Sequence, residues 1–215
     1  MVRQARSEAT RKRILNSAVD LFAEVGYQAT ALGDIIDRAK MTKGAFYYHF
    51  DSKEALATAV IEEGAGTALA AFRHIAETSA PALEHMIRGV FVVAGMVRTD
   101  KVVRTGAQLI RAFGEFNSAT ESTHGLLSAE MADKARAAIA EGDIREDQDP
   151  QALGEVIVSA MLGAELISNV SSAGSDLIDR IAQTWQLLLP ALATETSLPR
   201  FCEFVEREAR RHSPR

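Results

Sequence analysis

Cysteine is nearly absent from this chain of 215 residues, which contains only Cys202. A single thiol cannot form an internal disulfide, and no Cys or His stands beside Cys202 at the spacing of a metal site. β-branched residues are few beside Ala, Leu, Glu and Arg, which favour helices over strands. These shortages predict an all-α protein that works in a reducing compartment.

Long apolar runs are missing as well. No segment reaches the roughly 18 uninterrupted apolar residues of a membrane span, and the Arg-rich start leads into a charged amphipathic pattern instead of a signal peptide. The composition, 47% hydrophobic and 25% charged, is typical of a soluble globular protein. We therefore expect a cytoplasmic protein without a membrane partner.

The motifs of several enzyme classes are also absent. The sequence has no Gly-rich phosphate loop, no nucleophile elbow and no His-Glu-x-x-His zinc motif. Glu121 and His124 fit one Glu-x-x-His pattern, but a di-iron site in a helical bundle needs two such patterns and further glutamates. We therefore expect no enzymatic activity, no catalytic residue, no metal site and no cofactor.

The net charge of −5 is distributed unevenly along the chain. Residues 1–54 hold nine basic and seven acidic side chains, a charge of +2, which leaves −7 for the remainder. Five of the basic residues fall within residues 1–13, where the acidic residue is Glu8. A basic head on an acidic body predicts that only the head meets a polyanion such as DNA.

The basic head contains three helical patterns in close succession. Apolar residues at helical spacing predict a first helix over Ser7–Val25, which Gly26 ends. A second helix over Ala31–Ala39 follows an N-cap at Thr30, and Thr42 caps a third helix after a tight turn. Two short helices joined in this way, the second with an outward polar face, form a helix-turn-helix arrangement.

The third pattern, Thr42–Phe50, has more polar and aromatic surface than a buried helix needs. At about 100° per residue, Phe46 and Phe50 share one stripe that docks, while the remaining surface is displayed. The alternative is that the polar aromatic residues edge a satellite core. The flanking caps favour display, because Asp51–Glu54 forms a capping box that starts a fourth helix running to about Thr78.

The displayed residues have the chemistry of a DNA contact. Hydroxyl, ammonium and imidazole groups can donate to phosphates, glycine allows close approach, and an aromatic ring can pack on a thymine methyl or sugar. Because the helix contains no Arg, Asn or Gln for bidentate base contacts, we expect DNA shape and the basic arm to contribute. The expected DNA-binding residues are Thr30, Thr42, Lys43, Gly44, Tyr47, Tyr48, His49 and Lys53.

The remaining sequence predicts further helices. The next helix is expected to start at Ser79 and Pro81, another is capped by Asp100, and a mobile loop is expected at Gly114–Gly125. The helix after that loop is expected to end at Ala140, before Gly142, and Asp149-Pro150 opens its successor, which a turn at Ser171–Gly174 follows. The last two helices are expected at Ser175–Leu189, before Pro190, and from Ser197. The helix after Pro150 is apolar almost all round and needs neighbours on several sides. With its successor it could form half of a four-helix bundle completed by a second subunit, and packing within the monomer is the alternative.

The later helices hold more apolar residues than a connecting scaffold requires, with a few polar groups that could orient a small molecule. A ligand pocket is one interpretation, and plain core packing is the other for every candidate. Trp185 differs slightly because a buried indole N–H requires an acceptor. The candidate ligand-binding residues are Phe91, Gln108, Phe113, Leu127, Met161 and Trp185.

Two stretches of the head resemble a known family. RILNSAVDLFAEVGYQAT and MTKGAFYYHFDSKEAL are similar to the DNA-binding domain of the TetR family of bacterial transcriptional regulators. TKGAFYYHFDSKEALA and VVRTGAQLI also resemble the γ-butyrolactone and related furan receptors of actinobacteria, although Leu127 replaces an aromatic residue of those receptors. The resemblance implies a helix-turn-helix domain at residues 1–54, a bridging helix at about 52–78, and a helical ligand-binding and dimerisation domain at residues 55–215.

The resemblance also implies a mechanism. A homodimer formed through helices 8 and 9, at about residues 149–170 and 175–189, would place two recognition helices about 34–36 Å apart on a palindromic double-stranded DNA operator. A small, largely apolar effector that favours a conformer with wrongly spaced recognition helices would lower operator affinity and release a repressed gene. The alternative is a DNA-organising or partner-recruiting protein without an effector.

Overall fold

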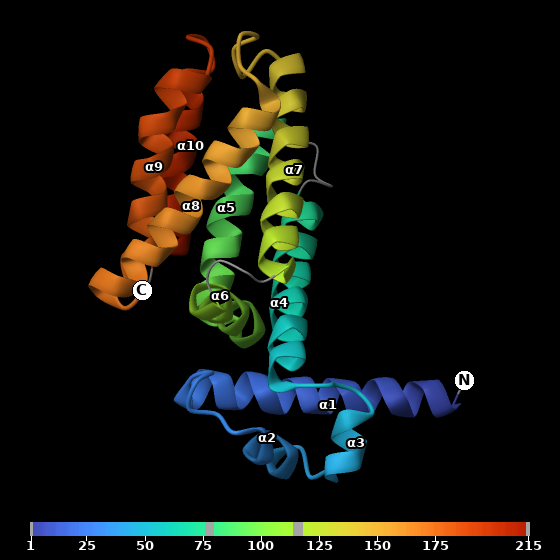
Figure 1. Ribbon diagram of the computed structural model, residues 1–215. Helices are drawn as coiled ribbons and strands as arrows, with labels where there is room; N and C mark the ends of the chain where they lie inside the picture. The colour runs from blue at the N-terminus through green and yellow to red at the C-terminus, as the bar shows by residue number, and fades with distance from the viewer. Residues whose placement is uncertain (1, 76–79, 114–117, 214–215) are drawn as a thin grey trace. The chain divides into compact units, whose positions relative to one another are not determined.

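Helix-forming segments separated by short polar turns account for the regular structure (Figure 1). The computed structural model describes residues 2–75, 80–113 and 118–213, and the all-α fold class is confirmed for this part of the chain. The helices are α1 (Val2–Val25), α2 (Leu32–Arg38), α3 (Lys43–Tyr47), α4 (Lys53–Ile75), α5 (Ala82–Thr99), α6 (Lys101–Phe113), α7 (Ser118–Ala140), α8 (Pro150–Ser172), α9 (Leu177–Leu192) and α10 (Leu198–His212).

The first helix is longer than the sequence predicts. α1 begins at Val2 instead of Ser7, because its first residues are polar but include no helix breaker. The predicted end at Gly26 is confirmed: its φ of +82° lies in the left-handed region, and its N–H donates to the Phe22 carbonyl at 3.1 Å. The additional turns lengthen the basic end of the chain.

Thr30 is not the cap of the second helix, as the sequence suggested. Ala31 is the N-cap of α2, and its N–H donates to Asp34 Oδ2 at 3.2 Å. The hydroxyl of Thr30 instead donates to the carbonyl of Gly26 at 2.7 Å. Thr30 therefore stabilises the turn that leads into α2.

Of the N-caps predicted for the next two helices, the first is confirmed and the second is wrong. Thr42 caps α3 as expected, since its Oγ1 accepts the N–H of Ala45 at 3.2 Å. At the start of α4, Ser52 takes the place expected for Asp51, because Ser52 Oγ accepts the N–H of Ala55 at 3.0 Å. Two neighbouring residues can both serve as N-caps here, and local sequence does not choose between them.

The burial predicted for Phe46 and Phe50 is confirmed, although α3 itself ends at Tyr47, earlier than the predicted pattern of Thr42–Phe50. Phe46 and Phe50 are 0% and 4% exposed, whereas Tyr47 and Tyr48 are 44% and 77% exposed. Phe46 and Phe50 belong to a core that also contains Ile14, Leu15, Ala18, Phe22, Ile35, Ile36, Leu56, Val60 and Ile61. Because a five-residue helix is not stable alone and each buried Phe contributes about 1.5–3 kcal/mol, packing holds α3 in place.

The chain folds into two compact units that alternate in the sequence. The first unit comprises Met1–Thr67 and Asp100–Thr120, and the second comprises Ala68–Thr99 and Glu121–Arg215. The units therefore do not follow the boundary expected after residue 54: α4 crosses from one to the other, and α6 belongs to the first unit.

The second unit has a separate apolar core built by α5 and α7–α10. α10 packs on α9 and α5, and α8 packs along α9. Its largest fully buried side chains include Trp185, Phe91, Phe201, Leu83, Met86 and Ile87. The helix predicted after Ser197 is confirmed as α10, and Asp149 caps α8 as expected by accepting the N–H of Gln151 at 3.0 Å.

Several predicted ends in the second half are wrong. The loop expected at Gly114–Gly125 is helical from Ser118 onward, and α9 continues through Pro190 to Leu192. Pro190 removes only the helix hydrogen bond of its own nitrogen, and the N–H of Ala193 still donates to the carbonyl of Leu189 at 2.8 Å. Ser79, Thr78 and the loop residues 114–117 lie outside the described residues.

α8 leaves much of its apolar surface uncovered within one chain. Among the described residues, α4 and α8 are long and apolar enough to cross a membrane by length and composition, but 44% of the relevant stretch is buried in α4 and only 28% in α8. Val156, Leu166, Ile167 and Val170 of α8 are 45–80% exposed. Exposed apolar surfaces of this kind commonly mark interaction sites in proteins.

Candidate nucleic-acid interface

α2 and α3 form a short helix pair packed on α1 within the first unit (Figure 1). The turn between them contains Lys40 at φ +52°, a left-handed conformation that is uncommon for a residue with a side chain. Met41 N–H donates to the Ile36 carbonyl at 3.2 Å, which fixes the start of α3 relative to α2. The predicted tight turn is therefore present and well connected.

The buried side of α3 is an aromatic cluster. The Phe46 and Phe50 ring centroids lie 6.0 Å apart, and the Tyr47 ring meets Phe46 edge-on at 5.5 Å. The Arg11 guanidinium of α1 lies 5.1 Å from the centre of the Phe50 ring. These contacts fix the rotation of α3 about its own axis, which determines the side chains that it displays.

The exposed side of α3 presents donors around an open backbone. Lys43 is exposed, and its Nζ lies 5.9 Å from the centre of the Tyr47 ring. Tyr48 packs edge-on against His49 with the ring centroids 5.0 Å apart. A methyl group at Gly44 would meet no protein atom within 4 Å. A ligand backbone could therefore approach α3 at Gly44 between an ammonium group and phenol groups.

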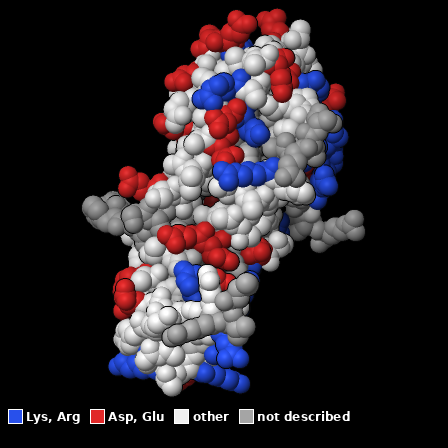
Figure 2. All heavy atoms as spheres, turned by 90° about the vertical axis from the view of Figure 1, so that its right-hand side faces the viewer, with Lys and Arg blue, Asp and Glu red and all other residues white. Residues whose placement is uncertain are grey.

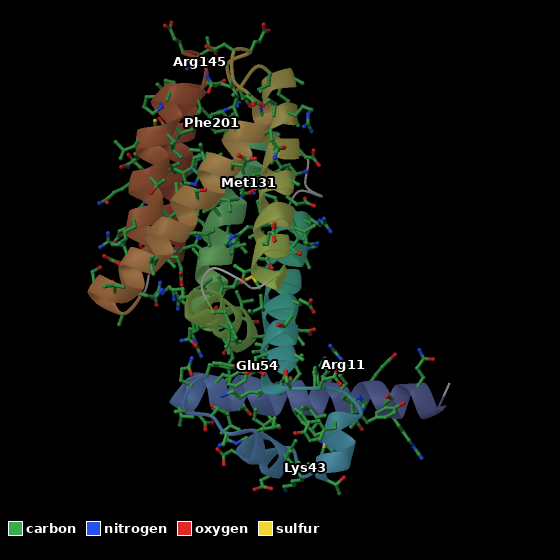
Figure 3. All side chains as sticks on the ribbon, in the orientation of Figure 1. Arg11, Lys43, Glu54, Met131, Arg145 and Phe201 are labelled. Carbon is green, nitrogen blue, oxygen red and sulfur yellow. The ribbon has the colours of Figure 1, made fainter. Side chains whose placement is uncertain are left out.

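Basic side chains extend this surface along α1. Arg6, Arg11, Lys12 and Arg13 are all exposed on the N-terminal part of the helix. Figure 3 places Arg11 on α1 and Lys43 on α3, and Figure 2 shows Lys and Arg side chains along the lower edge of the first unit. The positive charge of the head is therefore concentrated near α3, as a polyanion site requires.

Thr30 is buried, and the half-buried Lys53 makes hydrogen bonds inside the protein. Thr30 is 2% exposed, and its hydroxyl is engaged with the carbonyl of Gly26. Lys53 Nζ donates to the carbonyl of Tyr27 at 3.0 Å and to that of Thr30 at 2.9 Å. Lys53 thus ties the start of α4 to the turn between α1 and α2.

Tyr27, which follows the end of α1, contacts the start of α4 through both its ring and its hydroxyl group. Its ring lies 4.2 Å from Lys53 Nζ, and its hydroxyl donates to Glu54 Oε1 at 3.1 Å. Burial, together with the neighbouring Glu54 carboxylate, raises the pKa of Tyr27 to about 12. The phenol therefore remains a proton donor at neutral pH.

Two family models match most of the chain. The model described as bacterial regulatory proteins, tetR family, matches residues 14–60, and the model of the tetracyclin repressor-like C-terminal domain matches residues 80–194. The chain belongs to the TetR family. It is therefore a DNA-binding regulator and not an enzyme, in agreement with the missing enzyme motifs.

Two curated relatives match different shares of the chain. The A-factor receptor protein of Streptomyces griseus is 30% identical over 202 residues, which cover 90% of this chain and 67% of the relative. The regulator UidR of Escherichia coli is 40% identical over 70 residues, covering 33% of this chain and 36% of UidR. The first relative is similar along most of the chain and the second over about a third of it.

Solved TetR-family structures agree with the fold. A gamma-butyrolactone receptor described as ArpA-like superposes with a TM-score of 0.73 at 25% identity, covering 96% of this chain and 99% of the receptor. CprB of Streptomyces coelicolor, solved with its operator sequence, gives a TM-score of 0.73 at 26% identity over the same shares. The resemblance to the γ-butyrolactone receptors is therefore confirmed in both sequence and fold.

The six candidate effector-binding residues are divided between the two units of this TetR-family chain. Phe91, Leu127, Met161 and Trp185 belong to or pack against the core of the second unit. Gln108 is exposed on α6 of the first unit, and the half-buried Phe113 ring lies 4.6 Å from the Tyr27 ring in the same unit. Among the described residues, the buried indole N–H of Trp185 has no hydrogen-bond acceptor.

Proposed function

We propose that this protein is a dimeric repressor that binds a palindromic operator in the cytoplasm and leaves it when a small effector binds. The displayed surface of α3 carries this proposal. Its exposed face combines Lys43, Tyr47 and Tyr48 with an open backbone at Gly44, while Phe46 and Phe50 anchor the other face. Thr42, Lys43, Tyr47 and His49 then contact phosphates, and Tyr48 packs on a base or sugar.

The dimer is proposed to form through α8 and α9. Val156, Gly163, Ile167 and Val170 recur at spacings of seven, four and three residues, so they share one exposed stripe of α8. On the adjacent helix α9, Leu187 is 80% exposed. A second copy of the same two helices would cover these residues and complete a four-helix bundle.

The dimer can be tested by introducing charge into the stripe. Val170→Glu should turn a dimer into a monomer in sedimentation equilibrium, because it places a carboxylate in the apolar interface. Leu126→Glu is the matched control, since Leu126 is 55% exposed on α7, outside the two helices. A Val170→Glu protein that remains dimeric would remove α8 from the interface.

The effector is proposed to be a small, largely apolar molecule with a carbonyl group, bound in the second unit. The buried Trp185 N–H requires an acceptor, and the surrounding side chains are apolar. Relatives described as an A-factor receptor and a gamma-butyrolactone receptor favour a lactone. Phe91, Leu127 and Met161 are the further candidates for its apolar contacts.

The function can be tested in two steps. Operator DNA is first selected from a random double-stranded library, and the affinity of the protein for it is measured by fluorescence anisotropy. A series of alkyl γ-butyrolactones is then added, with the fluorescence of Trp185, the one tryptophan in the sequence, as a direct report of binding. A lactone that changes this fluorescence should also release the DNA.

Two results would contradict the proposal. A lactone that binds without changing operator affinity would remove effector control, and tight binding of a monomer to one half-site would remove the palindromic dimer. Chromatin immunoprecipitation tests the alternative of a DNA-organising protein, which should occupy many chromosomal sites instead of one or a few promoters.

A further inference from the structure

We infer that Phe113 and Tyr27 form a contact through which α6 sets the placement of α3, so that Tyr27 is a positioning residue for operator binding. The inference rests on the proposed repressor function for its biological meaning. The contact lies wholly within the first unit, between the C-terminal end of α6 and the turn that follows α1.

α6 is well placed to carry a signal because of the path of the chain. The chain crosses between the two units at three places, within α4, before Asp100 and after Thr120. α6 lies between the second and third crossings, so both of its ends continue into the second unit.

The middle of α6 packs closely on α4 at a crossing of two glycines. A methyl group at Gly64 would lie 3.0 Å from the carbonyl oxygen of Val102, and one at Gly106 would lie 3.4 Å from that of Val60. The two helix backbones therefore touch at this crossing without interlocking side chains.

Phe113, at the end of α6, extends the contacts of this helix to the turn after α1. The Phe113 and Tyr27 ring centroids are 4.6 Å apart with an angle of 57° between the planes, and Tyr27 also meets Phe22 of α1 at 5.4 Å. Displacement of α6 therefore changes the position of the Tyr27 ring or opens a cavity beside it.

Tyr27 passes such a displacement to the DNA-binding helices through several hydrogen bonds. Its carbonyl accepts from Lys53 Nζ at 3.0 Å and from the Thr30 N–H at 3.3 Å, and its hydroxyl donates to Glu54. The turn leads directly into α2, which is connected to α3 as described above. The angle between the α2–α3 pair and α4 thus depends on where the Tyr27 ring lies.

The inference predicts that the Phe113 ring is needed for operator binding and not only for stability. Phe113→Ala and Phe113→Leu should each weaken binding to the selected operator by about tenfold or more, whereas Phe113→Tyr, which keeps the ring, should bind as the wild type does. Ile110→Ala is the matched control, because Ile110 is also half-buried on α6 and packs on the same core. It should lower the melting temperature but change operator affinity less than about threefold.

Hydrogen exchange provides a second measurement that needs no DNA. Amide protection at residues 26–31 and 40–49 should fall in both Phe113→Ala and Phe113→Leu, and remain near the wild-type level in Ile110→Ala. Tyr27→Leu combined with Phe113→Ala should weaken operator binding less than the product of the two single effects, because both remove the same contact.

The outcomes separate this inference from the proposed function. Equal effects of Phe113→Leu and Ile110→Ala on exchange would overturn the contact as a positioning device, whatever the DNA result. A wild-type protein that selects no operator would overturn the repressor function, while the exchange experiment would still decide the role of Phe113. Independent, multiplicative effects of Tyr27→Leu and Phe113→Ala on operator affinity would also contradict the inference.

Discussion

Replacing Gly44 by alanine should affect folding and DNA binding in opposite directions. Gly44 lies in α3 on its exposed side, and an added methyl group would meet no protein atom within 4 Å. The methyl group therefore costs nothing in the free protein. Because alanine has a better helix propensity than glycine, the substitution should stabilise the first unit by about 0.5–1 kcal/mol.

The operator-bound state should be affected in the other direction. If the DNA backbone approaches α3 at Gly44, the methyl group occupies space that the complex needs, and overpacking of this kind costs about 1–3 kcal/mol per site. A twofold dimer contains two copies of α3, so the cost is about doubled. The smallest total, about 2 kcal/mol, corresponds to roughly a 30-fold weaker operator complex.

Two assays and one control decide the matter. Chemical denaturation measures the free energy of unfolding, and fluorescence anisotropy measures the dissociation constant of the selected operator. Gly66→Ala is the control, since Gly66 is exposed on α4 and equally free of neighbours within 4 Å. It should stabilise the fold without changing DNA affinity. A Gly44→Ala protein that binds the operator as tightly as the wild type would show that DNA does not approach this backbone.

Three further predictions concern charge, protonation and packing. In anisotropy titrations, Lys43→Ala should reduce the slope of log affinity against log salt concentration by about 0.9 for each phosphate that the ammonium group no longer neutralises. Lys53→Ala should lower the melting temperature and leave that slope unchanged. Burial lowers the pKa of His85 from its ordinary value of 6.5, so the unfolded state binds more protons than the folded state. The free energy of unfolding should therefore fall as the pH drops below 6.5. His85→Gln should reduce this loss of stability in denaturation curves. Gly154→Ala should destabilise the second unit by about 1–3 kcal/mol because the new methyl group would lie 2.4 Å from a backbone oxygen of α7, and Gly125→Ala, without close neighbours, should not.

Features that depend on a few adjacent residues could be predicted from the sequence. The cap at Thr42 and the stripe of Phe46 and Phe50 both follow from helical geometry, which acts over one or two turns. Errors of one residue, such as Asp51 for Ser52, occurred where two neighbours have equivalent capping chemistry. The helical nature of residues 118–125 was missed because polarity and Gly125 suggested a loop, although helix formation tolerates both on an exposed face.

Roles that depend on distant residues could not be predicted. Lys53 has the charge and position of a phosphate contact, yet its ammonium group bonds to carbonyls 23 and 26 residues earlier in the chain. Phe113 has an apolar aromatic side chain of the kind that lines ligand pockets. Its helix, α6, belongs to the first unit, however, and brings the Phe113 ring to Tyr27. Both roles follow from long-range contacts, for which helical periodicity contains no information.

The shortness of α3 explains why such distant contacts matter for DNA binding. A helix of five residues cannot maintain its own direction, so the direction of its displayed face follows from Phe46, Phe50 and the turn before α2. That turn is held by Tyr27 and Lys53, and a Lys53→Ala protein would keep every displayed side chain of α3 while losing two of the hydrogen bonds that orient it. Under the proposed function, operator specificity depends on the turn before α2 as well as on the side chains that α3 displays.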